Sequence, residues 1–324
     1  MNKFLLAAAL SLPFGSVAAE TLTVYTYDSF VSDWGPGPQI KAAFEAECGC
    51  ELRFIGAGDG AALLARLWLE GARTEADVVL GLDNSLMTQA RGMGIFAPLA
   101  KAPNGLALPI AWEDDTFLPF DWGYLAFVYD STKLTEVPDS FQALADSSLS
   151  IVIQDPRSST PGLGLVHWVK MAYGDGAEDI WRGLADNIVT VTKGWSEAYG
   201  MFLEGEADMV LSYTTSPAYH LIAEDDPSKS AALFSEGHYL QVEVAAKLLS
   251  SDKQALADEF LAFITTDAFQ SVIPETNWMY PATAVAVPEG FGQMITPAPV
   301  SNMLTLSDAD LEASIEEWVR VLSE

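Results

Sequence analysis

The chain has 324 residues, of which 45 are acidic and 16 basic, so its formal net charge at pH 7 is −29. A surface with this charge repels nucleic acids and anionic membranes, which argues against both as partners. The length exceeds what one hydrophobic core usually serves, so it predicts two lobes. With two cysteines and three histidines, a thiolate metal site or a Cys/His nucleophile pair has weak support.

Residues 1–19 have the three parts of a secretory signal: a positive charge at Lys3, an apolar run from Phe4, and small residues that end at Ala18 and Ala19. We expect cleavage before Glu20 and export to the periplasm. The apolar run is too short for a membrane anchor, and no other segment reaches about eighteen uninterrupted apolar residues. No cysteine follows the signal to carry a lipid. We therefore expect a free periplasmic monomer without stable membrane insertion.

Strand and helix patterns alternate through the first block of the chain. Strands are expected at 22–27, 51–56 and 77–82, and helices at 38–47 and 60–70. Pro38 in the first turn of one helix and Gly71 just after the other are typical helix start and stop signals. This βαβαβ order predicts a parallel, doubly wound α/β sheet.

Cys48 and Cys50 lie between the first helix and the second strand, separated by one glycine. Export permits a disulfide between them. A ring this small would stabilise little by the loop-entropy argument, so the sequence leaves the bridge open.

The same alternation returns in a second block. The expected strands lie at 150–154, 188–192 and 207–213, and the expected helices at 162–173, 177–185, 196–203 and from 216 onward. Two further strand-like runs, 125–129 and 239–245, are positioned to cross between the lobes. An amphipathic helix at 253–265 returns to the first lobe, and a loop at 283–299 precedes a C-terminal helix.

These patterns divide the chain into four parts. We predict a signal peptide at 1–19, the first lobe at 20–120, the second lobe at 121–244, and a segment at 245–324 that returns to the first lobe and forms the C-terminal helices.

Ligands of open α/β sheets bind at the carboxyl ends of the strands, beside helix N-termini that attract anions. Here the strand ends carry aromatic, acidic and hydroxyl residues, at 27–29, 59–60, 83–84, 155–164, 193–196 and 213–217. Aromatic faces and carboxylates suit a flat cationic heterocycle, and hydroxyl groups or glycines at helix starts suit phosphate. Each feature alone is more often a helix cap or packing. Six successive strand ends of this kind favour a ligand site.

Runs spread over the whole chain after the leader resemble, in the same order, the thiamin-binding proteins of bacterial ABC importers. The runs are L-T-V-Y-T-Y-D-S-F (22–30), D-W-G-P-G-P (33–38), A-D-V-V-L-G-L-D-N (76–84), Q-D-P-R-S-S-T-P-G-L-G (154–164), T-V-T-K-G-W-S-E-A-Y-G (190–200), L-S-Y-T-T-S-P-A-Y-H (211–220), S-E-G-H-Y-L-Q-V-E-V-A (235–245) and N-W-M-Y-P (277–281). The resemblance implies a two-lobed, type II periplasmic-binding fold with the ligand cleft between the lobes. It also implies that the lobes close on thiamin, thiamin monophosphate or thiamin diphosphate as transported ligands.

The resemblance further implies a set of ligand-contacting residues. They are Tyr27, Asp59, Gly60, Ser159, Thr160, Trp195, Tyr213, Thr214, Thr215, Ser216, Tyr219 and Trp278. We expect the aromatic rings to stack on the pyrimidine and the thiazolium. Ser159, Thr160 and the N–H groups at Gly60 and Gly162 are expected to hold phosphate, with Lys193 a further candidate.

Asp59 precedes an apolar-periodic helix, and we expect its side chain to cap that helix. We expect no catalytic residue, no metal and no cofactor, because transport makes and breaks no bond. The loaded protein would dock on a permease driven by a separate ATPase, in keeping with a chain that has no P-loop.

Two alternatives stay open. The first is a ferric-ion or polyamine carrier of the same fold. Iron could use the phenolates of Tyr213 and Tyr219, although few histidines and many tryptophans weigh against it. A thiaminase-like enzyme would need a nucleophilic cysteine in the cleft. Cys48 and Cys50 fall at the amino end of a strand, opposite the expected cleft.

Overall fold

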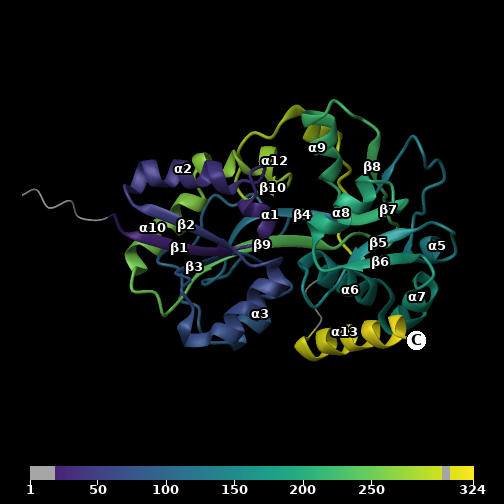
Figure 1. The fold of residues 1–324 in the computed structure, drawn as a ribbon, viewed down its shortest axis with the longest axis horizontal. Helices are drawn as coiled ribbons and strands as arrows, with labels where there is room; N and C mark the ends of the chain where they lie inside the picture. The colour runs from purple at the N-terminus through teal and green to yellow at the C-terminus, as the bar shows by residue number, and fades with distance from the viewer. Residues whose placement is uncertain (1–18, 301–306) are drawn as a thin grey trace, which may run out of the picture.

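The computed structural model describes residues 19–300 and 307–324. The predicted secretory signal lies outside the described residues, except for Ala19. Two α/β lobes lie side by side and share one sheet (Figure 1). The strand order is β2-β1-β3-β9-β4-β7-β5-β6, and β8 and β10 pair with β4.

The first lobe is built on three parallel strands, β1 (Thr21–Thr26), β2 (Glu51–Gly56) and β3 (Val78–Asp83). Its helices are α1 (Asp28–Val31), α2 (Gly37–Cys48), α3 (Gly60–Glu70) and α4 (Met87–Gly92), and η1 (Gly71–Arg73) follows α3. The strands and the helices α2 and α3 lie within one residue of the predicted bounds, because their hydrophobic patterns are local. The short helices α1 and α4 were not predicted.

Two long strands connect the lobes. β4 (Leu118–Asp130) pairs with β9 (Leu240–Lys247) through its first half and with β7 through residues 125–129, in antiparallel fashion throughout. β9 also pairs with β3. The sequence predicted only residues 125–129 of β4. Its first half contains proline, aspartate and glycine, which are rare in strands, and the pairing with β9 overrides that local preference.

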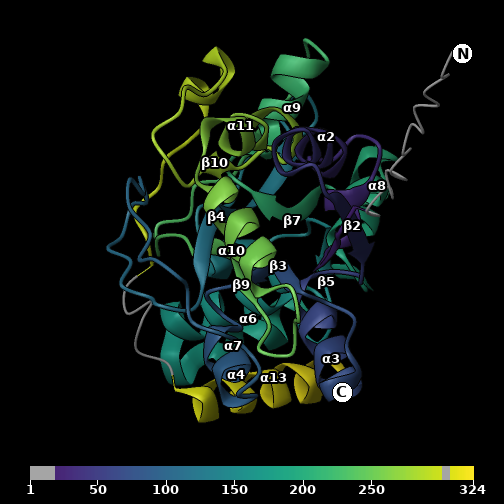
Figure 2. The ribbon, with the colours of Figure 1, turned by 90° about the vertical axis from the view of Figure 1, so that its left-hand side faces the viewer.

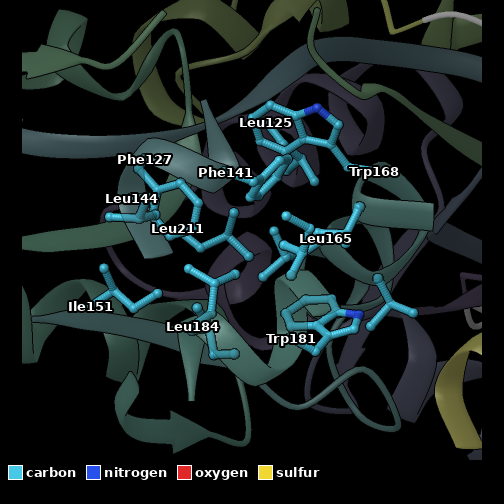
Figure 3. Packing of buried hydrophobic residues seen from close by; sticks show 14 of the residues in the cluster. Leu125, Phe127, Phe141, Leu144, Ile151, Leu165, Trp168, Trp181, Leu184 and Leu211 are labelled. Atoms are coloured by element: carbon cyan, nitrogen blue, oxygen red, sulfur yellow. The ribbon is translucent and has the colours of Figure 1, made fainter. Parts of the chain in front are cut away.

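The second lobe repeats the parallel arrangement with β5 (Ile151–Gln154), β6 (Ile188–Thr192) and β7 (Met209–Tyr213). The elements around these strands are α5 (Phe141–Ala145), α6 (Thr160–Tyr173), η2 (Gly174–Gly176), α7 (Ala177–Leu184), α8 (Trp195–Leu203), α9 (Ser216–Ala223) and β8 (Lys229–Ala231). Its core packs Phe127, Phe141, Trp168 and Trp181 between the sheet and these helices (Figure 3).

The chain returns to the first lobe through α10 (Gln254–Ile264), as predicted, and this helix packs on β9 and α2. Next come α11 (Asp267–Gln270), α12 (Ile273–Thr276) and β10 (Tyr280–Pro281). The predicted loop contains η3 (Glu289–Gln293), which contacts α9 of the second lobe. The last helix, α13 (Asp308–Leu322), packs on α6 and α7, so the C-terminus belongs with the second lobe (Figure 1). Figure 2 shows α13 along the bottom of the molecule, below α6 and α7.

Cys48 and Cys50, the two cysteines of the chain, form a disulfide between α2 and β2. The glycine between them has a φ of 64°, in the left-handed region, and ends α2. The structure therefore settles the question that the sequence left open, and neither cysteine is a free thiol. Among the described residues, no helix combines the length and the apolar character needed to cross a bilayer.

Candidate functional site

The two lobes contact each other at Asp59. This residue precedes α3, all of whose residues are described. Its carboxylate makes no hydrogen bond to the N–H groups of α3 and faces the second lobe instead. It accepts hydrogen bonds from the Ser159 hydroxyl at 2.7 Å and from the Trp195 backbone N–H at 3.0 Å. The prediction that Asp59 caps α3 is therefore wrong. Donors from the second lobe reach the carboxylate, and no local pattern around residue 59 could reveal them.

The second lobe also reaches the first turn of α3. The Ala62 N–H donates to the Ser158 carbonyl at 3.1 Å, so a carbonyl of the second lobe takes up one free N–H of this helix. Burial raises the pKa of the Asp59 carboxyl, and its hydrogen bonds from Ser159 and Trp195 partly oppose that rise. Because both hydrogen-bond donors come from the second lobe, the pKa of Asp59 depends on the contact between the lobes.

Gly60 permits this close approach. A Cβ at residue 60 would lie 2.5 Å from the Gly81 carbonyl oxygen and 2.6 Å from the Thr160 Cγ2. The first contact is with backbone and the second is with the other lobe. Any larger residue at position 60 would therefore force the lobes apart.

Ser159 and Thr160 lie at the start of α6, and both are buried, with 0% and 4% of their surface exposed. The Ser159 hydroxyl is engaged by Asp59 and makes no hydrogen bond to the N–H groups of α6, whose residues are all described. Lys193 is exposed, and its carbonyl accepts a hydrogen bond from the Ser158 hydroxyl. Asp59, Gly60, Ser159, Thr160 and the Trp195 backbone are thus brought together at one contact.

The loop after β7 joins this contact through Trp195. The indole N–H of Trp195 donates to the Ser212 hydroxyl at 2.8 Å, and the ring stacks on Tyr199 with 5.1 Å between centroids. The Ser216 hydroxyl lies 2.7 Å from that of Ser212 and accepts from the Tyr213 N–H. Of the predicted residues here, Thr214, Thr215 and Ser216 are buried and Tyr213 is partly buried.

Tyr219 and Trp278 form a second contact between the lobes. Tyr219 lies on α9, and Trp278 follows α12 of the first lobe; their ring centroids are 5.3 Å apart at an interplanar angle of 70°. Trp278 has a φ of 56°, which is rare for a bulky residue. Strained backbone of this kind clusters at ligand sites, where the surrounding structure holds it.

Tyr27 belongs to a buried polar network that joins the crossing strands. Its hydroxyl donates to Glu243 at 2.9 Å and accepts from the Asn277 amide at 2.8 Å. Asn277 also donates to Asp121 at 2.7 Å, and Asp121 pairs with Glu243 across β4 and β9. Burial raises the pKa of Asp121 to about 7 and raises the pKa of Glu243 well above its usual range.

Sequence reasoning missed Asp121, Glu243 and Asn277. The only local signal was Glu243 inside the strand-like run 239–245, since an acidic residue is unusual in a buried strand, whereas Asp121 lies outside any predicted strand. Gln241 links this network to the rest of the site, because its amide donates to the Tyr213 hydroxyl at 3.0 Å and to Glu243 at 3.2 Å.

The site therefore combines aromatic rings, buried carboxyl groups and buried hydroxyl donors, contributed by two lobes that two long strands connect. Aromatic faces and carboxylates attract an organic cation, and hydroxyl and N–H donors hold anionic oxygens. This fold and this site define a two-lobed solute-binding protein, with the candidate site between the lobes.

Comparison with known proteins agrees with this class. Residues 74–296 match the model of the bacterial extracellular solute-binding protein family, and the chain belongs to that family. A thiamine-binding periplasmic protein of Salmonella typhimurium is 52% identical over 309 residues, with 94% of each chain covered.

Solved structures show the same fold. The structure of a periplasmic thiamin binding protein matches with a TM-score of 0.91 and 51% identity, covering 97% of this chain and 100% of the other. Iron-bound HitA from Pseudomonas aeruginosa matches with a TM-score of 0.74 and 22% identity over 93% of this chain and 99% of its own. The second likeness shows the fold alone.

Proposed function

We propose that this protein captures thiamin, thiamin monophosphate and thiamin diphosphate in the periplasm and delivers them to an ABC importer. The observation that carries the proposal is the 52% identity, over 94% of the chain, to a relative named for thiamine binding. The contacts between the lobes support it, because they supply groups for both ends of such a ligand.

The cationic rings of thiamin would bind among the aromatic residues. Trp278 and Tyr219 come from opposite lobes and contact each other, so a ligand ring that stacks against this pair would favour closure. Each cation–aromatic contact contributes about 0.5 to 2 kcal/mol. The carboxyls of Asp59, Asp121 and Glu243 would balance the charge of the thiazolium, since a buried acid ionises more readily beside a cation.

The phosphate esters would extend toward α6. Thr160 lies at the first turn of this helix, where free N–H groups and the helix dipole favour anions. Gly162 lies two residues further on in the same turn, and a Cβ there would meet the Gln154 carbonyl at 2.4 Å, so this turn packs tightly on the end of β5. Thiamin and its esters are cargo in this proposal. No residue is assigned a catalytic role and no cofactor is required.

The loaded, closed monomer would dock on a membrane permease whose ATPase is a separate chain. The ligand favours closure only by the difference between its affinities for the closed and open arrangements. A thiaminase-like reaction is disfavoured because both cysteines are bonded to each other.

A ferric-ion carrier is the second candidate of this fold. The Tyr213 hydroxyl accepts from Gln241, and the Tyr219 hydroxyl donates to Glu224, so the two phenols have different partners. Iron would require them to leave these partners and converge.

Calorimetry on ligand-stripped protein tests the proposal. The protein is unfolded, dialysed and refolded, and then titrated with thiamin, with each ester, with inorganic diphosphate and with ferric citrate. We expect binding near one-to-one for thiamin and its esters, and native mass spectrometry of freshly isolated protein should show one of them bound. Binding of iron alone, with a visible phenolate band, would overturn the proposal in favour of the iron carrier.

A further inference from the structure

A histidine and two carboxylates meet where α9 ends, outside the contacts described above. One ligand atom each from His220, Glu224 and Asp226 lies within 4.8 Å of the others. The Nδ1 of His220 lies 2.6 Å from a carboxylate oxygen of Glu224. The proposed capture of thiamin uses none of these three side chains directly.

The backbone brings the three residues together. His220 and Glu224 are one helical turn apart, so their side chains share a face. Asp225 has a φ of 53°, in the left-handed region that Asn and Asp tolerate best. This turn reverses the chain, and the Asp226 N–H donates to the His220 carbonyl at 2.9 Å. Asp226 is thereby held beside the imidazole.

The imidazole is fixed in orientation. His220 is 1% exposed, and its Nε2 lies 2.9 Å from the hydroxyl of the buried Tyr199. Its Nδ1 therefore faces the two carboxylates. Metal-binding histidines commonly have their second ring nitrogen held by a hydrogen bond in this way, which fixes the ring and its tautomer.

The carboxylates are accessible to solvent. The Glu224 side chain is 44% exposed and the Asp226 side chain 38%. A cavity of about 330 Å³ adjoins the cluster and is lined by all three residues, by Asp130 and Asp208, and by Lys229. Lys229 forms ion pairs with Asp130 at 3.2 Å and with Asp226 at 3.4 Å. A metal ion at Asp226 would therefore compete with this lysine for the carboxylate.

We propose that His220, Glu224 and Asp226 form a binding site for a divalent transition-metal ion, with Zn²⁺ the best match. One imidazole nitrogen and two carboxylate oxygens make three protein ligands, and a fourth position would face the cavity. Mg²⁺ and Ca²⁺ prefer all-oxygen sites and fit less well. This proposal differs from the sequence expectation of no metal. The turn at Asp225, which brings Asp226 to His220, has no recognisable sequence motif.

Electrostatics favour a cation here. The C-terminal end of α9 carries the negative end of its helix dipole. Four acidic residues line the adjoining cavity against two lysines: Asp130, Asp208, Glu224 and Asp226 against Lys133 and Lys229.

The site adjoins the ligand-binding aromatics. The other carboxylate oxygen of Glu224 accepts a 2.9 Å hydrogen bond from the Tyr219 hydroxyl, and Tyr219 packs on Trp278. A metal ion on Glu224 would thus restrain Tyr219.

Titration with Zn²⁺ alone tests the site and does not depend on the proposed vitamin ligand. The protein carries no histidine tag, is dialysed against EDTA and then against metal-free buffer, and is titrated by calorimetry with Zn²⁺ and, separately, Mg²⁺. We expect one Zn²⁺ site and much weaker Mg²⁺ binding. Co²⁺ in place of Zn²⁺ should give visible d–d bands typical of nitrogen and oxygen ligation.

Glu224→Gln and Asp226→Asn should each weaken Zn²⁺ binding by about tenfold or more. Asp225→Asn is the matched control: it removes the same charge from the same turn, keeps a residue that tolerates positive φ, and leaves the three ligands in place. Its Zn²⁺ affinity should equal that of the wild type. Circular dichroism verifies that each variant is folded. Absence of Zn²⁺ binding in the wild type, or equal affinities for the wild type and both ligand variants, would overturn the proposal, as would an equal loss in Asp225→Asn.

Discussion

The Ser159 hydroxyl donates a 2.7 Å hydrogen bond to the Asp59 carboxylate, and the two residues belong to different lobes. The same carboxylate accepts the Trp195 N–H. Residues expected to bind the ligand therefore also bind each other across the interface. We therefore expect closure of the lobes and capture of the ligand to depend on one set of groups, so that a substitution in that set changes both.

Asp59→Ala removes the acceptor for both donors from the second lobe. A hydrogen bond to a charged group contributes about 1.5 to 3 kcal/mol, so we expect ligand affinity to fall by about tenfold or more. Small-angle scattering should show a larger radius of gyration for the variant. Asp59→Asn keeps one acceptor oxygen, so its ligand affinity and radius of gyration should lie between those of the wild type and Asp59→Ala.

The control for Asp59 is Asp267→Ala, which removes an exposed acid from the first turn of α11. It should leave affinity and radius unchanged. If Asp59→Ala behaves like this control, the contact across the lobes does not contribute to closure.

Buried acids make stability depend on pH. Burial raises the pKa of Asp83, which is 0% exposed, to about 7. A raised pKa means that the folded state holds a proton that the unfolded chain loses near its ordinary pKa of about 3.9. The stability from this group is full below about pH 4 and is lost as pH rises to 7, at up to about 1.4 kcal/mol per pH unit.

Urea unfolding of ligand-free protein between pH 4.5 and 7.5 measures this dependence. We expect the free energy of unfolding to decrease with rising pH, with Asp121 adding to the effect. Asp83→Asn keeps the oxygen that accepts the Ser85 and Leu86 N–H groups and removes the titration. Its slope should be smaller; an identical slope would mean that Asp83 is ionised in the folded protein.

Tryptophan fluorescence should report the ligand. Trp195 and Trp278 lie at two of the contacts between the lobes, so thiamin should quench emission at near one-to-one stoichiometry. Trp278→Phe should reduce the quenching. Trp68→Phe, which removes a 67% exposed indole from α3, should leave the quenching unchanged.

Trp195→Ala should weaken the binding of thiamin and of both esters to a similar degree, because the rings are common to all three ligands.

Selectivity for phosphate should depend on Thr160 more than on Ser159. The Ser159 hydroxyl is engaged by Asp59, so Ser159→Ala should weaken all three forms of the vitamin by opening the lobes. Thr160→Val has nearly the same shape and removes only a hydroxyl. It should weaken the diphosphate by about tenfold while leaving thiamin nearly unchanged. Equal losses for thiamin and its diphosphate would place the phosphate elsewhere.

The hydrophobic pattern within a single segment was enough to predict elements such as β2 and α3. Such patterns failed where a distant partner decides the structure. The first half of β4 is a strand because β9 pairs with it, and Asp59 faces Ser159 although its sequence position is that of a helix cap. The pair of Asp121 and Glu243 could not be predicted, because the register that places them side by side is a property of two strands.

The position of β9 has a consequence for synthesis and export. β9 covers the edge of β3, yet β3 ends at Asp83 and β9 begins at Leu240, after most of the second lobe. A chain that emerges N-terminus first therefore exposes the edge of β3 until nearly the whole second lobe has crossed the membrane. The first lobe is begun first but completed late. Chains interrupted before Leu240 would carry an unpaired strand, and we expect periplasmic proteases to remove them.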